Sequence, residues 1–266
     1  MTISPRNLSQ PISAVASTFF ASLFCISLCC ASLVFTPDAR AAEEDEHVDT
    51  APTKLDVKLT ASWYRSSDGN DANDLNVRGN RGDHAAWIGV YRDHTPYRQA
   101  RAGYEFTQHA GPAQIVWSAQ AASGGFLGGS ITAQIGDPTY AIVGFGRTNL
   151  KSYYNLNFDP NDAITLGIGR HLDDKTDVSI YQIRDDRLDT RQRITHLYLH
   201  RKLSGTHRYS IDATVKSGLN SDGSFITGYG LTATLAYQQY FVRLARDQYA
   251  NFSATTQTRV SLGMGF

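Results

Sequence analysis

Apolar and polar side chains alternate residue by residue through most of the chain from residue 54 onward. The clearest blocks are residues 55–63, 99–106, 208–216 and 229–237. In an extended chain successive side chains point to opposite faces, so each block presents one apolar and one polar face. A helix would instead need apolar residues three or four positions apart, and that pattern is nearly missing after residue 54. The alternation therefore predicts an all-β protein.

The length of these blocks indicates what the apolar faces contact. Each covers about 9 to 11 residues, the length that a tilted strand needs to cross a bilayer, whereas strands of soluble proteins are nearer 5 or 6 residues. Tyr and Trp gather near the ends of the blocks, as at Trp63, Tyr64 and Tyr237, and such rings favour the headgroup level of a membrane. Lipid offers the backbone no hydrogen bonds, so strands span a membrane only as a closed barrel. We therefore expect a transmembrane antiparallel up-and-down β-barrel.

The pattern predicts a barrel of 12 to 14 strands, an estimate that rests on the block spacing. The candidate strands are residues 54–64, 74–80, 84–92, 97–107, 113–123, 125–135, 139–147, 163–171, 176–185, 190–202, 207–217, 226–237, 239–247 and 255–266. Residues 74–80 are the weakest candidate, because they also suit a loop or the start of one long strand with 84–92. An even strand number places both ends of the barrel in the periplasm and the longer connections outside.

The segment RVSLGMGF alternates to its last residue, with Val260, Leu262, Met264 and Phe266 on one face. Closure of a barrel requires this strand to pair with the first one, so its apolar face lies against lipid. A chain with these features resembles outer-membrane β-barrel proteins of Gram-negative bacteria. The resemblance implies that Phe266 is an assembly signal and that the protein lies in the outer membrane. It also implies outer-membrane lipid, lipopolysaccharide and the barrel assembly machinery as partners.

The leading segment has the features of a cleaved signal peptide. Arg6 precedes an apolar run from Ala14 to Phe35, and the small residues Ala39 and Ala41 form a cleavage site. An uncleaved membrane anchor is the alternative. The three cysteines lie inside the apolar run, so the exported chain is expected to hold no disulfide. The predicted divisions are a signal peptide (1–41), an acidic periplasmic tail (42–53) and the transmembrane barrel (54–266).

Charge and hydropathy exclude other functional classes. The formal net charge is +0 at pH 7. Nucleic-acid binding needs a concentrated basic patch, so we expect no nucleic-acid partner. After the leading segment no stretch of about 18 or more apolar residues follows, so no transmembrane helix is expected.

The polar faces of the strands predict the lining of the lumen. A guanidinium offers a fixed fork of donors that matches carboxylate or phosphate, so a lumen rich in arginine should favour anions. The alternative is that these cations neutralise acids in a filled interior. The expected lumen residues are Lys58, Arg92, Arg101, Glu105, Arg208, Asp212, Lys216, Arg243 and Arg259.

The segment GFGRTNLKSYYNLNFDPND is the most distinctive connection. Its amides, acids and tyrosines make a polar and aromatic loop that is able to fold inward and narrow or cap a pore. Arg147 is expected to anchor this constriction through Asp159 or Asp162, and Tyr153 and Tyr154 are expected to belong to it. The alternative is an ordinary external loop turned by an Asp-Pro-Asn sequence.

The sequence shows no recognisable catalytic or metal site. His196 and His200 lie about 13 Å apart on a strand that rises about 3.3 Å per residue, so they do not share a metal. The acidic stretch from Asp68 to Asp74 lacks the spacing of an EF-hand calcium loop and suits a solvated turn. No serine and histidine match the patterns of barrel phospholipases, lipid A deacylases or proteases. We expect no catalytic residue, no metal and no cofactor.

These observations favour a narrow passive channel for small, anionic solutes. Two alternatives stay open. One is an outer-membrane lipid or lipopolysaccharide hydrolase, and the other is a structural barrel with a filled lumen.

Overall fold

The structure, a computed structural model, describes residues 54–266. The predicted signal peptide (1–41), its cleavage site at Ala39 and Ala41, and the predicted tail (42–53) lie outside the described residues.

Residues 54–266 form fourteen β-strands and one short 3-10 helix, η2 (Ala250–Phe252). The strands are β1 (Asp56–Ser66), β2 (Ala72–Arg81), β3 (His84–Asp93), β4 (Arg98–Ala110), β5 (Ala113–Ala122), β6 (Phe126–Ile135), β7 (Thr139–Thr148), β8 (Ala163–Asp173), β9 (Thr176–Asp185), β10 (Arg193–Ser204), β11 (His207–Leu219), β12 (Phe225–Tyr237), β13 (Tyr240–Asp247) and β14 (Gln257–Gly265). Each candidate strand overlaps one of these, so the upper end of the predicted strand number is confirmed. Among residues 54–266, no helix is long and apolar enough to cross a membrane.

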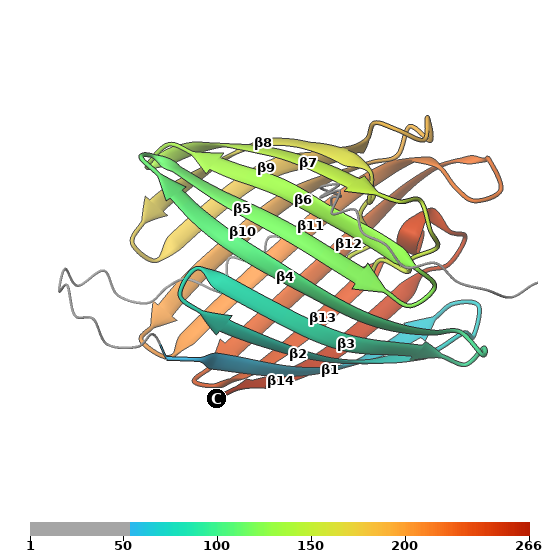
Figure 1. Cartoon of the computed structure of the whole chain (residues 1–266), viewed down its shortest axis with the longest axis horizontal. Helices are drawn as coiled ribbons and strands as arrows, with labels where there is room; N and C mark the ends of the chain where they lie inside the picture. Colours follow the sequence, from blue (N-terminus) through green and yellow to red (C-terminus); the bar gives the residue numbers. More distant parts are fainter. Residues whose placement is uncertain (1–53) are drawn as a thin grey trace, which may run out of the picture.

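The strands close into one barrel (Figure 1). Each strand pairs antiparallel with its neighbours in the sequence, and β1 pairs with β14. The last residue is paired as well, because Phe266 donates its backbone N–H to the Val57 carbonyl at 2.8 Å. Closure removes the unpaired strand edges that lipid has no means to satisfy. The predicted up-and-down β-barrel is confirmed.

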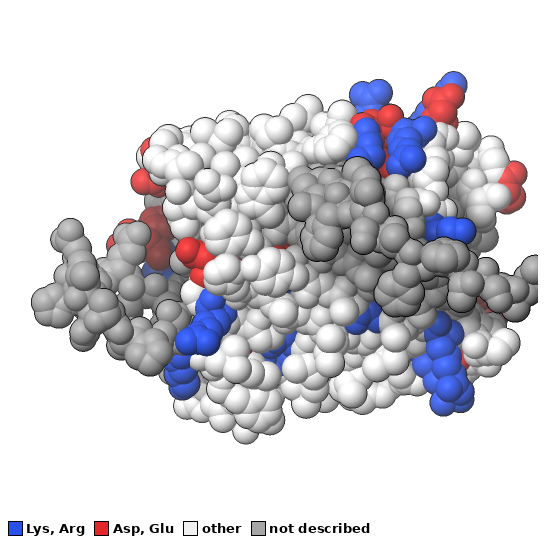
Figure 2. Space-filling model, viewed as in Figure 1, with Lys and Arg blue, Asp and Glu red and all other residues white. Residues whose placement is uncertain are grey.

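The two faces of the barrel have opposite polarity. On β12, Leu231 and Leu235 are 54% and 57% exposed on the outside, whereas Thr234 faces the lumen and is 7% exposed. The same parity holds on β14, where Leu262 is exposed and Ser261 is buried. Figure 2 shows the outcome as a largely uncharged outer wall with most charged side chains toward its two ends. Such a surface suits a barrel that has hydrocarbon outside and polar groups within.

The two ends of the barrel differ in their connections. At one end the connections are short, such as residues 82–83, 111–112 and 174–175. At the other end residues 149–162 and 248–256 form long connections. We call these the turn end and the loop end; the loop end lies at the right in Figure 1, opposite the C-terminus. In bacterial barrels short turns face the periplasm and longer loops face outward.

Candidate solute pathway through the barrel

Residues 149–162, the inner loop, connect β7 to β8 and cross the lumen. The Tyr154 ring stacks on Tyr91 of β3 with centroids 4.7 Å apart, and its hydroxyl donates to Gln257 of β14 at 3.1 Å. Gln99 of β4 donates to the Tyr154 carbonyl at 3.1 Å and accepts from the Tyr154 N–H at 2.9 Å. Two strands further along the wall from β4, the Tyr153 ring stacks on Phe126 of β6 with centroids 4.1 Å apart. The loop therefore folds inward and reaches strands on several sides of the barrel.

Apolar packing holds the middle of the inner loop. Phe158 is 6% exposed and packs in one buried cluster with Tyr64 and Tyr91. Its φ of 67° lies in the left-handed region, which phenylalanine rarely adopts and which persists only where surrounding contacts fix the residue. Arg259 of β14 donates to the Leu156 carbonyl at 2.9 Å. These contacts fix the path of the loop across the lumen.

A buried histidine connects the inner loop to the wall. His196 of β10 places its Nε2 3.2 Å from an oxygen of Asp159 in the loop and its Nδ1 3.0 Å from an oxygen of Asp212 on β11. Tyr181 stacks on the imidazole with centroids 4.5 Å apart. One side chain thus cross-links two strands and the inner loop.

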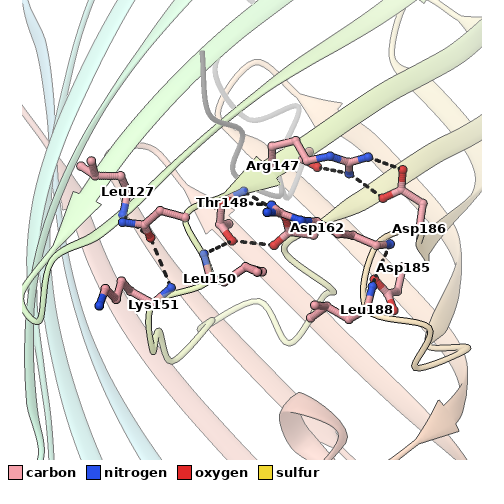
Figure 3. A network of polar contacts seen from close by, with 12 residues as sticks. Leu127, Arg147, Thr148, Leu150, Lys151, Asp162, Asp185, Asp186 and Leu188 are labelled. Carbon is pink, nitrogen blue, oxygen red and sulfur yellow. Dashed lines mark hydrogen bonds and ion pairs between the residues drawn. The ribbon is translucent and has the colours of Figure 1, made fainter. Parts of the chain in front are cut away.

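Polar contacts fix the base of the inner loop (Figure 3). Asp162 accepts from the Thr148 N–H at 3.1 Å and from Arg187 at 2.8 Å; Arg187 lies in the connection between β9 and β10. Arg147 binds Asp186 of the same connection, with Nη1 2.5 Å from a carboxylate oxygen. The prediction that Arg147 anchors the loop through Asp159 or Asp162 is therefore wrong.

Strand parity explains this correction. The neighbours Gly146 and Thr148 are buried and face inward, so Arg147 faces outward with Phe145. Its guanidinium carbon lies 4.1 Å from the centroid of the Phe145 ring. The cation that meets Asp162 comes instead from another connection, which brings Arg187 over the base of the loop.

Two cavities follow one another along the lumen. The inner cavity, of about 290 Å³, lies beside the inner loop and is lined by strands on both sides of the seam between β1 and β14. The turn-end cavity, of about 330 Å³, is lined by strands β2 to β10. Arg78, Glu105 and Tyr198 line both cavities, and Arg78 forms an ion pair with Glu105. This ion pair therefore stands where the two cavities meet.

Ion pairs neutralise the most deeply buried charges of the inner cavity. Arg101 lies 2.7 Å from Asp74, and both side chains are 5% exposed. Lys216 lies 2.5 Å from Asp247 and is 1% exposed. A charge taken out of water is costly unless a partner compensates it, which explains the pairing.

Further cations of the inner cavity stand on neighbouring strands. Lys58 on β1, Arg243 on β13 and Arg259 on β14 line it; we call these three the basic wall. The Lys58 ammonium lies 4.3 Å from the centroid of the Phe241 ring. Arg243 donates to the Thr234 hydroxyl at 3.1 Å. The cations in the lining of the inner cavity outnumber its acids.

Two expected lumen residues lie away from the two cavities. Arg92 faces outward, because the buried Tyr91 next to it takes the inward position on β3. Arg208 has the parity of the inward residues, two positions before the buried Ser210, but it is exposed near the turn end. It lines neither cavity. The prediction that Arg92 faces the lumen is therefore wrong, whereas Arg208 has the predicted inward parity and lies at the turn end of the barrel.

Several residues that shape the lumen were missed from the sequence. Asp74, Arg78 and Asp247 complete ion pairs, and each has the inward parity of its own strand, so a strict parity count finds them. Tyr91 and Gln99 hold the inner loop. Their role depends on the path of the loop between β7 and β8, and no alternation encodes that path.

Known structures share this fold. The chain is similar to the outer membrane protein Omp33 of Acinetobacter baumannii, with a TM-score of 0.53 and 9% identity over 81% of this chain and 100% of that chain. It is also similar to the KdgM porin, with a TM-score of 0.46 and 7% identity over 79% and 99% of the two chains. No protein-family model and no curated protein matches the sequence. The closed barrel and the likeness to Omp33 show that the chain has the fold of a porin-like outer-membrane β-barrel.

Proposed function

We propose that the protein is a narrow passive channel for small solutes. The observation that carries the proposal is the pair of cavities, of about 290 and 330 Å³, that meet at Arg78 and Glu105. A barrel filled for structural purposes would be packed with side chains along its length. The inner loop narrows this path and leaves space beside it.

We further propose that the channel favours anions. The cations that line the inner cavity outnumber its acids, and the three cations of the basic wall stand along one side of it. Fixed charge on a pore wall raises the local concentration of ions of opposite sign. The guanidinium groups of Arg243 and Arg259 also suit carboxylate and phosphate groups on a solute.

A structural barrel is the second candidate. The aromatic cluster of Tyr91 and Phe158, 2% and 6% exposed, packs the lumen at the loop end and favours a closed interior. The hydrolase alternative stays a prediction, which release of fatty acid from labelled phospholipid or lipid A would test.

Planar-bilayer recording separates the channel from the structural barrel. The purified, folded protein is expected to give discrete conductance steps. Under a salt gradient, the sign of the reversal potential is expected to show a preference for anions over cations. Replacing both Lys58→Glu and Arg243→Glu should move that potential toward cation preference, because it reverses charge on the basic wall. Arg208→Glu is the matched control, because Arg208 lines neither cavity. Absence of steps at any voltage would favour the filled barrel.

We also propose that residues 1–41 direct export and that the chain assembles in the outer membrane through the barrel assembly machinery. Phe266 stands exposed at the end of β14, which pairs with β1 at the barrel seam, a position that suits recognition of a terminal aromatic. Phe266→Ser is expected to lower the yield of barrel in the outer-membrane fraction, while Phe266→Tyr keeps it. N-terminal sequencing of the exported protein should begin at residue 42.

A further inference from the structure

Arginines gather on the outer face of the barrel at the loop end, where Figure 2 shows several basic side chains at the right with acidic ones among them. Strand parity and position place there Arg65, Arg92, Arg98, Arg147, Arg184, Arg193 and Arg246. The outward arginines near the turn end are Arg81, Arg170 and Arg201. Outward arginines are thus more numerous at the end that carries the long loops.

Two pairs of these arginines lie directly opposite each other on adjacent strands. Arg92 of β3 faces Arg98 of β4, and Arg184 of β9 faces Arg193 of β10. Opposed residues in an antiparallel pair have Cβ atoms about 4.5 to 5.5 Å apart, and like charges there repel. Within residues 54–266, the side chains of Arg92 and Arg98 make no hydrogen bond or ion pair that would offset this repulsion.

An apolar groove lies next to the Arg92 and Arg98 pair on the same outer face. Its volume is about 490 Å³. Two residues further along each strand, toward its middle, Val90 and Ala100 oppose each other. The groove therefore begins directly beside the two arginines. Small alanines between larger branched side chains produce the hollow. The outward residues of its lining are Leu75, Val77, Ile88, Val90, Ala100, Ala102 and Ala121.

We propose that this groove and arginine pair bind one phosphate-bearing lipid of the outer leaflet. The acyl chain fills the groove, where it covers apolar surface at the depth of the hydrocarbon. The lipid phosphate bridges the guanidinium groups of Arg92 and Arg98, each of which offers a planar fork of donors to its oxygens. The bridging anion turns a like-charge repulsion into two attractions.

Comparison with the second arginine pair shows why the apolar groove favours a lipid over a free anion. Two residues further along these strands, toward their middle, Gln182 and Thr195 oppose each other and form a hydrogen bond of 2.9 Å. The pair of Arg184 and Arg193 therefore has polar side chains beside it, and it offers positive charge without an apolar groove for an acyl chain. A free anion would suit both pairs equally, whereas a lipid suits Arg92 and Arg98.

Native mass spectrometry of the folded protein in dodecyl maltoside tests the proposal, with diphosphorylated lipid A as the probe. The wild-type protein is expected to retain the lipid. Replacing both Arg92→Gln and Arg98→Gln should weaken its binding about tenfold or more, because charge-assisted hydrogen bonds to phosphate are lost. Replacing both Arg184→Gln and Arg193→Gln removes the same charge away from the groove and should change binding less than threefold.

A second variant separates the lipid from a free anion. Ala102→Phe fills the groove and should weaken lipid A binding while both arginines remain. Folding of each variant is checked by the shift in gel migration on heating. Equal lipid binding by the wild type and by the Arg92 and Arg98 variant would overturn the proposal. Displacement of the lipid by an equal concentration of inorganic phosphate would also overturn it, because the site would then be one for free anions.

Discussion

Lys216 and Asp247 illustrate how a single residue depends on its partner in the lumen. Lys216 is 1% exposed and its ammonium lies 2.5 Å from the Asp247 carboxylate. Water reaches neither group well, so each charge depends on the other for its compensation. The lumen therefore tolerates these charges as a pair.

Asp247→Asn is expected to destabilise the barrel by about 3 to 5 kcal/mol, because it leaves a buried ammonium without its anion. The second replacement Lys216→Met in the same chain should recover most of that loss, because it removes the unpaired charge. Urea unfolding in lipid vesicles measures both. A double variant no more stable than Asp247→Asn alone would show that the pair is not coupled.

A substitution at Leu231 tests whether the outer face of β12 contacts lipid. It lies in the middle of β12 and is 54% exposed on the outside. Leu231→Arg should cost about 2 to 4 kcal/mol in a bilayer, because it places a charge near the midplane. Phe225→Arg, at the start of the same strand, is the control and should cost about 0 to 1 kcal/mol near the interface. Equal costs at both positions would mean that Leu231 lies no deeper in the bilayer than Phe225.

At the scale of elements, the inner loop depends on contacts with strands remote in the sequence. Gln99 makes two hydrogen bonds to the Tyr154 backbone. Gln99→Ala should loosen the loop and increase the noise of the open channel, because it leaves those backbone groups without partners. The control is Gln114→Ala, which changes the same type of side chain near the turn end. Unchanged noise in Gln99→Ala would mean that the ring contacts of Tyr154 hold the loop alone.

The loop also carries a pH dependence. Burial raises the pKa of the Tyr153 and Tyr154 hydroxyls above their usual value of 10.0. A raised pKa in the folded state means that the neutral phenols stabilise the packed loop below about pH 10 and that this contribution is lost as the pH rises further. We expect constant conductance up to about pH 10 and a change above it. Replacing both Tyr153 and Tyr154 by phenylalanine should remove the change in conductance. If the change persists in that variant, other titrating groups cause it.

At the scale of the whole molecule, the sequence predicted the barrel well because its physical cause is local. Alternation reports which face meets lipid, and it located even β2, the weakest candidate. The phase of one strand was misread at Arg92, where the inward position belongs to Tyr91. The partners of Arg147 and Asp162 were not predictable, because they depend on how two long connections meet at the loop end. Residue parity fixes the faces of a strand and says nothing about contacts between loops.

Single-channel conductance before and after shortening the inner loop tests whether the loop narrows an otherwise open lumen. Residues 151–160 are replaced by a short Gly-Ser linker, so that Thr148 and Asp162 keep the base of the loop. The shortened protein should conduct several times more current per step than the wild type and show weaker anion preference, because its pore is wider. Equal conductance in the two proteins, or no conductance in either, would contradict this expectation.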